Sequence, residues 1–429
     1  MRSRVLQYVA AFLALVGCLL AIWTTGRAGL SRLLSEYAVR SSLAPSESRV
    51  SAVATADQAV RLTPNDPAAH RARATALMES GRGGEAIVEF ERAVALRPNH
   101  YTLWLELGRA RDQQDDQQGA LEAFTEAARL APYYAQPHWQ RGNVLFRMGQ
   151  RDEAFAELRR AAMSDVTLLP ASIDLAWAAY AGDTRAVEQV FQPQTAPWRL
   201  ALARYFAKHG KPAEAVEQFR AAGQIPDYER RAFLMDLLTA RQFPEAYEVW
   251  SGGLETKSAE LRGGKGRLTD GSFESGLKFD DPGFGWQLIR LPALRYSLDT
   301  VEPKEGAHSV RIDFNGDFNP AFPIISQLVL VEPNARYRLH FASRSQEMVT
   351  GGLPVITVSD PGTSGNGRSL AESSPLPEGS TGWQEQTLEF TTAGETTAVL
   401  VSLVRQSCGS GPCPIFGRLW LDQFSIEKL

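Results

Sequence analysis

Residues 64–97, 98–131 and 132–161 read PNDPAAHRARATALMESGRGGEAIVEFERAVALR, PNHYTLWLELGRARDQQDDQQGALEAFTEAARLA and PYYAQPHWQRGNVLFRMGQRDEAFAELRRA. Aligned one below another, the three segments repeat with a period of 34 residues. The period holds in four columns: Pro64, Pro98 and Pro132; Ala86, Ala120 and Ala154; Phe90, Phe124 and Leu158; Ala93, Ala127 and Ala161. In each repeat the last three columns lie at i, i+4 and i+7, which is one apolar stripe of a helix.

A small residue also recurs twelve positions before the alanine of the second column, as Ala74, Gly108 and Gly142. The pattern resembles the tetratricopeptide (TPR) family, in which a small side chain here lets two helices approach closely. The resemblance covers about residues 48–260 and implies helix pairs that stack into an α-solenoid, because one pair cannot bury its own apolar face. We expect a TPR-like solenoid over 29–259, with regular repeats at 67–166 and degenerate ones at 167–259.

The N-terminus carries an almost unbroken apolar run, Val5 to Trp23, behind Arg2 and Arg4. Such a run is long enough to span a bilayer as a helix. Leu15-Val16-Gly17-Cys18 also looks like a bacterial lipobox, which would make Cys18 a lipidated N-terminus. We favour an uncleaved membrane anchor in 1–28 over a signal or lipobox segment, because the apolar run continues past Cys18. The expected location is the bacterial cytoplasmic membrane, single-pass, with the C-terminal bulk on the periplasmic or exterior side.

A Gly/Lys-rich linker at 252–266 separates the solenoid from a segment in which apolar residues alternate with polar ones. Val310, Ile312 and Phe314 show this period of two, which predicts short strands and a β-sandwich over 267–429. The expected fold is therefore multidomain: a transmembrane helix, an all-α solenoid and an all-β sandwich.

Several motifs in this segment follow one another in the order typical of a carbohydrate-binding family. They are Leu268-Thr269-Asp270-Gly271-Ser272-Phe273-Glu274, Gly285-Trp286, His308-Ser309-Val310-Arg311-Ile312, Tyr337-Arg338-Leu339, Gly382-Trp383 and Leu419-Trp420-Leu421-Asp422. From 268 to 429 the chain resembles carbohydrate-binding modules of the galactose-binding-like jelly-roll type. Such jelly rolls also serve as adhesion or structural modules, so the resemblance is poorly specific for a ligand.

Composition excludes some functions. A formal net charge of -4 gives no basic footprint, and we expect no nucleic-acid partner. Cys408 and Cys413 cannot complete a four-ligand zinc site alone, so a disulfide is expected if the compartment is oxidising. The six histidines are spread one per element, and the chain has no G-x-S-x-G, H-E-x-x-H or P-loop motif. We predict no enzyme.

Two surfaces are candidates for binding. The repeat register directs seven residues of first helices towards the concave face of the solenoid: Arg71, Thr75, Leu105, Arg109, Trp139, Asn143 and Phe146. A mixed aromatic and arginine surface suits an extended segment of a partner protein. The alternative is that these residues cover the next element of the same chain.

On the sandwich, sugar binding would need exposed rings beside polar groups. Six residues of turn-rich stretches offer them: Phe284, Trp286, Asn315, Asp317, Phe318 and Phe322. The alternative is that some of these loop aromatics close the ends of the barrel. The same family resemblance implies one structural calcium at Glu274 and Asp422, for which two carboxylates and backbone carbonyls could supply oxygen ligands. The alternative for these acids is a surface position for Glu274 and a strand-end hydrogen bond for Asp422.

The function that this architecture favours is a membrane-anchored, non-enzymatic scaffold. The solenoid would recruit a protein partner, and the sandwich would bind a cell-envelope or exported polysaccharide. The alternative is a structural or assembly protein whose sandwich caps the solenoid and binds no sugar. A glycosidase would need two facing carboxylates in a cleft, and the sequence nominates no such pair.

Overall fold

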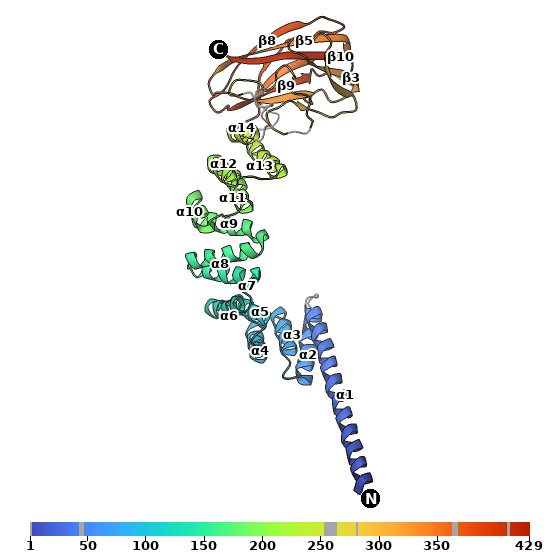
Figure 1. Cartoon of the computed structure of the whole chain (residues 1–429), viewed down its shortest axis with the longest axis vertical. Helices are drawn as coiled ribbons and strands as arrows, with labels where there is room; N and C mark the ends of the chain where they lie inside the picture. Colours follow the sequence, from blue (N-terminus) through green and yellow to red (C-terminus); the bar gives the residue numbers. More distant parts are fainter. Residues whose placement is uncertain (1, 43–46, 253–263, 280–281, 363–367, 410–411) are drawn as a thin grey trace. The chain divides into compact units, whose positions relative to one another are not determined.

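The computed structural model describes residues 2–42, 47–252, 264–279, 282–362, 368–409 and 412–429 (Figure 1). Most of the linker predicted at 252–266, with the predicted end of the solenoid at 259, lies outside the described residues. The chain divides into two compact units, one ending at Gln192 and the other beginning at Pro193. This division falls within the helical part of the chain and does not coincide with the change from helix to strand.

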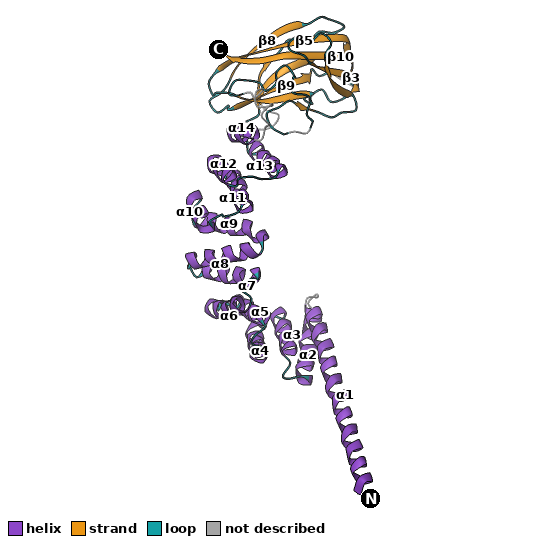
Figure 2. Ribbon diagram, in the orientation of Figure 1, coloured by secondary structure: helices purple, strands orange, loops and turns teal. Residues whose placement is uncertain are grey.

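The first unit consists of helices (Figure 2). They are α1 (Arg2–Ser42), α2 (Glu47–Leu62), α3 (Pro67–Glu79), α4 (Gly83–Leu96), α5 (Tyr101–Gln113), α6 (Gln117–Leu130), α7 (Ala135–Arg147), α8 (Arg151–Ser164), the short η1 (Val166–Leu168), α9 (Leu169–Ala179) and α10 (Thr184–Phe191). From α3 to α8 they form antiparallel pairs that follow the 34-residue period, since α3, α5 and α7 begin at equivalent positions.

The repeated residues build these pairs. Gly81 and Gly149 have φ angles of 78° and 80°, a left-handed conformation that ends a helix at little cost in glycine. Gly108 lies where α5 meets α6, and a Cβ added to it would stand 2.5 Å from the ring of Phe124. A small residue at this position therefore lets the helices of a pair touch, as the sequence predicts.

The second unit begins with α11 (Ala196–Lys208), α12 (Pro212–Ala221), α13 (Asp227–Thr239) and α14 (Phe243–Gly252). The described residues then form the strands β1 (Gln287–Leu288), β2 (Leu294–Asp299), β3 (Ser309–Asp317), β4 (Ile325–Leu330), β5 (Arg336–Thr350), β6 (Pro354–Asp360), β7 (Arg368–Glu372), β8 (Gln384–Thr391), β9 (Ala398–Arg405) and β10 (Pro414–Lys428). The TPR-like helical part is thus followed by a domain of antiparallel sheets, as predicted; the finer jelly-roll assignment stays a prediction.

The strands form two five-stranded sheets, ordered β1-β4-β9-β6-β7 and β2-β3-β10-β5-β8. Val310, Ile312 and Phe314 of β3 are buried and belong to one apolar core with Val399 and Val401 of β9. The core therefore lies between the two sheets, and the residues that alternate with it on β3 face outward.

Candidate functional site

The predicted groove residues of the solenoid form two columns on successive first helices. Arg71, Leu105 and Trp139 occupy one position of α3, α5 and α7, and Thr75, Arg109 and Asn143 occupy the position one turn later. Arg71 and Arg109 are exposed, whereas Leu105 is buried. Trp139, Thr75, Asn143 and Phe146 are half-buried.

Some of these side chains link neighbouring helices. Arg71 of α3 donates its Nε–H to Glu106 of α5 at 2.7 Å, and this hydrogen bond raises the pKa of the arginine. Arg109 of α5 donates to the Gln136 side chain of α7 at 3.0 Å. Arg71 therefore has a carboxylate partner, while the hydrogen-bond partner of Arg109 within the described residues is a neutral amide.

The remaining residues of this surface make their contacts within their own helix or helix pair. Thr75 and Asn143 donate to backbone carbonyl oxygens four residues earlier, at 3.0 and 2.8 Å. Phe146 packs its ring against Phe155 of α8, with centroids 5.8 Å apart. Between them, Trp139 contributes a half-buried ring to the surface.

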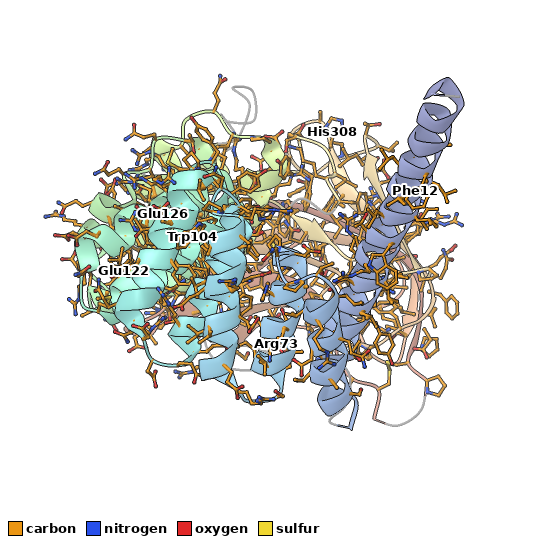
Figure 3. The ribbon with its side chains drawn as sticks, turned by 90° about the horizontal axis from the view of Figure 1, so that it is seen from below. Phe12, Arg73, Trp104, Glu122, Glu126 and His308 are labelled. Atoms are coloured by element: carbon orange, nitrogen blue, oxygen red, sulfur yellow. A yellow bond between two sulfur atoms is a disulfide. The ribbon has the colours of Figure 1, made fainter. Side chains whose placement is uncertain are left out.

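Histidine replaces tryptophan at one position inside the repeats, and both residue types donate a ring N–H to the same backbone carbonyl. His70 and His138 place Nε2 at 2.8 and 2.9 Å from the carbonyl oxygens of Pro64 and Pro132. Trp104, labelled in Figure 3, donates its indole N–H to the Pro98 carbonyl at 2.7 Å. These side chains therefore fasten each first helix to the turn before it, which is a structural role.

A hollow of about 360 Å³ lies beside α8 and α10 in the first unit. Phe155 and Tyr180 give it apolar walls, while Asp152, Arg159 and Gln189 supply polar ones. Arg159 also donates to the Val190 carbonyl at 3.2 Å. This hollow lies outside the predicted groove.

The structure does not expose the principal rings predicted to stack on sugars. Phe284 is 1% exposed and Trp286 is 8% exposed. Trp286 stacks on Phe273 with centroids 5.0 Å apart and donates its indole N–H to the Asp270 carbonyl at 2.9 Å. The expectation of exposed rings at these two positions is wrong, because their apolar area is used inside the domain.

The second predicted group of sugar-binding residues surrounds a buried arginine. The Arg405 guanidinium lies 4.9 Å from the centre of the Phe318 ring, and Asp317 accepts the backbone N–H of Cys413 at 3.0 Å. Phe318 is partly buried against the core. Asn315 is exposed on the outward side of β3, and Phe322 is 42% exposed. The six predicted residues therefore do not form one platform.

Cys408 and Cys413 are joined by a disulfide at the same corner. Arg405 donates to the carbonyl oxygens of Gly352 and Cys413. Burial lowers the pKa of Arg405, although the nearby Asp317 acts in the opposite direction. The arginine, the disulfide and the predicted loop residues thus hold one end of the sandwich together.

The carboxylates expected to bind calcium accept hydrogen bonds from N–H groups. Glu274 accepts from the backbone of Ala307 at 2.8 Å and from His308 at 3.0 Å. Asp422 is buried and accepts from the backbone of Lys304 at 2.7 Å and of Glu305 at 3.0 Å. These backbone N–H groups take about half of the roughly four lone-pair sites that each carboxylate offers, so the arrangement stabilises both carboxylates without a cation.

The pKa directions at the two carboxylates differ. Burial raises the pKa of Asp422 against three backbone hydrogen bonds. At Glu274 burial acts in the same direction, but hydrogen bonds from His308 and the backbone outweigh it and lower the pKa. Among the described residues, no group of three or more His, Cys, Asp or Glu side chains could hold a metal ion.

The outward face of the β2-β3-β10-β5-β8 sheet is a surface that sequence analysis missed. Arg311 alternates with buried residues of β3, and its register partner on β10 is Trp420, whose other partner is Arg344 of β5. The Arg344 guanidinium lies 4.3 Å from the Trp420 ring and 5.7 Å from the Trp383 ring. These contacts leave Trp420 only 4% exposed, although it points away from the core.

Exposed apolar groups lie at the other end of the same face. Phe416 of β10 is 50% exposed, and its partner Val349 of β5 is 60% exposed. Between them and the tryptophan, Arg418 pairs in register with Asp313 and donates to Gln346 at 3.1 Å. The sheet thus presents a free ring, planar polar groups and stacked arginines along one direction. The sequence predicts the alternation of buried and exposed residues on β3, but it does not predict the strand register that places Trp420 beside Arg311.

The N-terminal helix contains the apolar run. Among the described residues, Ala11–Ser42 is the one helix whose length and hydropathy would suffice to cross a membrane, and these properties suit a membrane span or a signal anchor. Its C-terminal half is part of the first unit: Arg27 donates to the Leu62 carbonyl at 2.6 Å, and the Ser31 hydroxyl to the Ala59 carbonyl at 3.1 Å. The exposed Cys18 lies on its apolar half.

Comparison with known proteins supports the helical assignment. The family model described as "Tetratricopeptide repeat" matches residues 51–92 and 71–135. Among solved structures, "Crystal structure of MamA" is 18% identical with a TM-score of 0.28, and the match covers 47% of this chain and 93% of that one. "MamA 41-end from Desulfovibrio magneticus RS-1" is 20% identical with a TM-score of 0.33, covering 39% and 94%.

A third similar structure is titled "Functional Characterization of Pseudomonas Aeruginosa pilF"; it is 16% identical with a TM-score of 0.34, and the match covers 51% of this chain and 98% of that one. No curated protein matches the chain. The family match thus supports tetratricopeptide repeats within residues 51–135, as the 34-residue period predicts.

Proposed function

We propose that the protein is a non-enzymatic, membrane-anchored scaffold whose solenoid binds an extended segment of a partner protein. One observation carries the proposal: positions 71, 105 and 139 and positions 75, 109 and 143 form two parallel columns on α3, α5 and α7. TPR arrays are generally non-enzymatic scaffolds. In the columns, Arg109 offers a charge whose hydrogen-bond partner within the described residues is a neutral amide, and Trp139 offers an aromatic surface, so the segment bound would carry an acidic group near an apolar side chain.

Site-specific photocrosslinking in cells tests this role. A photoreactive residue at Arg109 should give a discrete adduct with one protein, and the adduct should weaken when Trp139→Ala is added. Glu122 of α6 is the matched control, because it is exposed on a second helix of the same repeat (Figure 3). Equal adducts at both positions, or an adduct that Trp139→Ala leaves unchanged, would contradict the proposed groove.

Membrane anchoring by α1 is part of the same proposal. The apolar run supports it, and the disulfide at Cys408–Cys413 suits an oxidising compartment, on the periplasmic or exterior side. The full chain should resist extraction by alkaline carbonate, and its sheet domain should be digested by protease added to spheroplasts. Release by carbonate would contradict anchoring, and protection from protease would contradict the orientation.

Polysaccharide binding by the sandwich is a second candidate function, and the outward sheet face favours it. Phe416 offers an exposed ring, and Arg418, Asp313 and Gln346 beside it are planar polar groups that suit sugar hydroxyls. Glycan-array binding by the full chain should fall with Phe416→Ala and persist with Phe322→Ala, which lies outside this face. The reverse result would favour the loops predicted from sequence.

A structural role of the sandwich remains the alternative, and it has support inside the second unit. Tyr247 and Trp250 of α14 pack against Phe284, with ring centroids 5.0 and 5.7 Å apart. Phe284 thus covers the end of the last helix, as a capping module would. Folded protein that binds no glycan would favour this role.

A further inference from the structure

Large apolar side chains are exposed along one side of α1 from Phe12 to Tyr37. The seven residues of this line are each between 50% and 68% exposed: Phe12, Leu15, Leu19, Ile22, Leu30, Leu33 and Tyr37. At 3.6 residues per turn, these spacings keep all seven within an arc of about 80°. In the apolar half Leu13 and Leu20 are exposed on other sides as well, so the one-sided pattern is distinctive only beyond Trp23. Phe12, labelled in Figure 3, stands near the N-terminal end of the line.

The opposite side of the same helix packs on its own unit. Ser31, Ser35, Ala38 and Ser42 are buried, and α1 contacts both α2 and α3. These four positions lie about half a turn away from the apolar line. The line therefore faces away from the helices of the first unit, and none of them can cover it without α1 turning over.

In the membrane placement proposed above, lipid does not reach the C-terminal part of the line. The apolar run ends at Trp23, and the rise of 1.5 Å per residue puts Leu30, Leu33 and Tyr37 roughly 10–20 Å beyond it. A run from Val5 to Trp23 is already about as long as the hydrocarbon layer is thick. Three large apolar side chains in water, at 50%, 67% and 59% exposure, mark an interaction surface rather than a lipid-facing one.

We infer that this line is a self-association surface, along which the α1 helices of two copies pair in parallel. The parallel geometry rests on the membrane placement proposed above, because copies inserted with one orientation present the same line at the same depth. Identical residues then face each other across a two-fold axis. The apolar line suits such parallel pairing because it carries no charged residue between Phe12 and Tyr37. Arg27, Arg32 and Glu36 all lie outside the arc of this line.

One further feature fits a second copy of the chain. Gly26 lies in the gap of the line between Ile22 and Leu30, and a Cβ added there would meet nothing within 4 Å, so two backbones can approach closely at this point. At about 60–120 Å² of apolar area for a whole side chain, the seven side chains at 50–68% exposure present about 250–500 Å² together. This is below the ~800 Å² per partner of a stable interface, so flanking side chains must contribute the rest.

Disulfide crosslinking of the full chain in membranes tests the inference. Leu33→Cys, in a Cys18→Ser background, should give a dimer of the chain on mild oxidation. Arg32→Cys is the matched control, because it is exposed, adjacent and about a third of a turn away. Equal yields at the two positions, no dimer at either, or a crosslink to a different protein at Leu33 would each overturn self-pairing.

A second measurement keeps the inference testable without engineered cysteines. Light scattering of the detergent-solubilised chain should give twice the monomer mass, and Leu30→Asn with Leu33→Asn should halve it while far-UV circular dichroism is unchanged. A monomeric wild type, or a dimer that survives both substitutions, would overturn it. Carbonate extraction is carried out on the same samples. A chain that resists extraction but is monomeric contradicts self-pairing alone, whereas a chain that carbonate releases contradicts the membrane placement.

Discussion

His138 Nδ1 lies 2.6 Å from Glu157 Oε2 in the pair formed by α7 and α8, and both side chains are buried. Arg141 and Arg160 also contact this carboxylate. The hydrogen bond with Glu157 raises the pKa of His138, against the effect of burial. Burial alone would raise the pKa of Glu157, but His138 and the two arginines outweigh it and lower that pKa.

The stability of the α7–α8 pair should therefore depend on pH. Because the pKa of His138 is raised on folding, its contribution is complete below about pH 6.5 and is lost as pH rises through the folded-state value. The contribution of Glu157 is lost only as pH falls through its lowered pKa. Amide hydrogen exchange of α7 and α8 should show lower opening free energies at pH 9 than at pH 6, and His138→Gln should remove that difference. An unchanged pH dependence in the variant would refute the assignment.

Gly108→Ala should destabilise the second repeat by about 1–3 kcal/mol, because the added methyl group would meet the Phe124 ring. Gly84→Ala is the matched control: it lies in α4, nothing stands within 4 Å of its added Cβ, and it should stabilise by about 0.5–1 kcal/mol. Thermal unfolding of both variants measures the contrast. Equal shifts would mean that close approach at Gly108 is not needed.

Trp286→Ala should unfold or strongly destabilise the sheet domain, by about 3–5 kcal/mol, because a buried ring and its hydrogen bond to Asp270 are lost. Phe416→Ala removes an exposed ring and should change the stability by less than about 0.5 kcal/mol. Near-UV circular dichroism during urea unfolding distinguishes the two. A stable Trp286→Ala variant would show that the ring is not part of the core.

Removal of calcium should leave the unfolding temperature unchanged, since N–H donors stabilise Glu274 and Asp422 without a cation. Unfolding is compared in EDTA and in millimolar calcium. Asp422→Asn should cost about 1–3 kcal/mol in both buffers, because its NH2 group would face backbone N–H donors, either those of Lys304 and Glu305 or that of Gln423. A rise in unfolding temperature with calcium would contradict this prediction and support the calcium site that the family resemblance implies.

Reduction of the Cys408–Cys413 disulfide should destabilise the sheet domain by about 2 kcal/mol, the value expected for so short a loop. The loss of protection from hydrogen exchange should be largest around Arg405. Thr350 and Gly352 accept hydrogen bonds from its guanidinium there. Hydrogen exchange with and without a reductant, together with a Cys408→Ser, Cys413→Ser double variant, gives the measurement. Exchange that changes evenly throughout the domain would argue against a local role.

The helical architecture was predictable because its physical requirement recurs at a fixed interval. Gly108 and Gly142 occupy the same place in two repeats, so chance similarity could be separated from a packing constraint. Alternation also identified β3, where Val310, Ile312 and Phe314 are buried as expected. In both cases the signal lay within one short stretch of the chain.

The surface of the sandwich was harder to predict because it depends on pairings between distant stretches. The register of Trp420 with Arg311 and Arg344 places it on the outward face under a guanidinium, and the sequence around Trp420 does not reveal either partner. Phe284 and Trp286 lie in turn-rich sequence that favoured exposure, but residues far along the chain, such as Trp250 and Phe424, cover them. Local composition carries no information about those partners.

The unbroken course of α1 has a mechanical consequence. A helix from Arg2 to Ser42 is about 60 Å long, and its C-terminal half is fastened to α2 through Arg27 and Ser31. With no loop between the apolar half and the packed half, the helix acts as a lever: a tilt or twist applied at Phe12 is delivered to the first helix pair of the repeats. Forces on the N-terminal end and loads on the solenoid would thus be transmitted to each other through a single rigid rod.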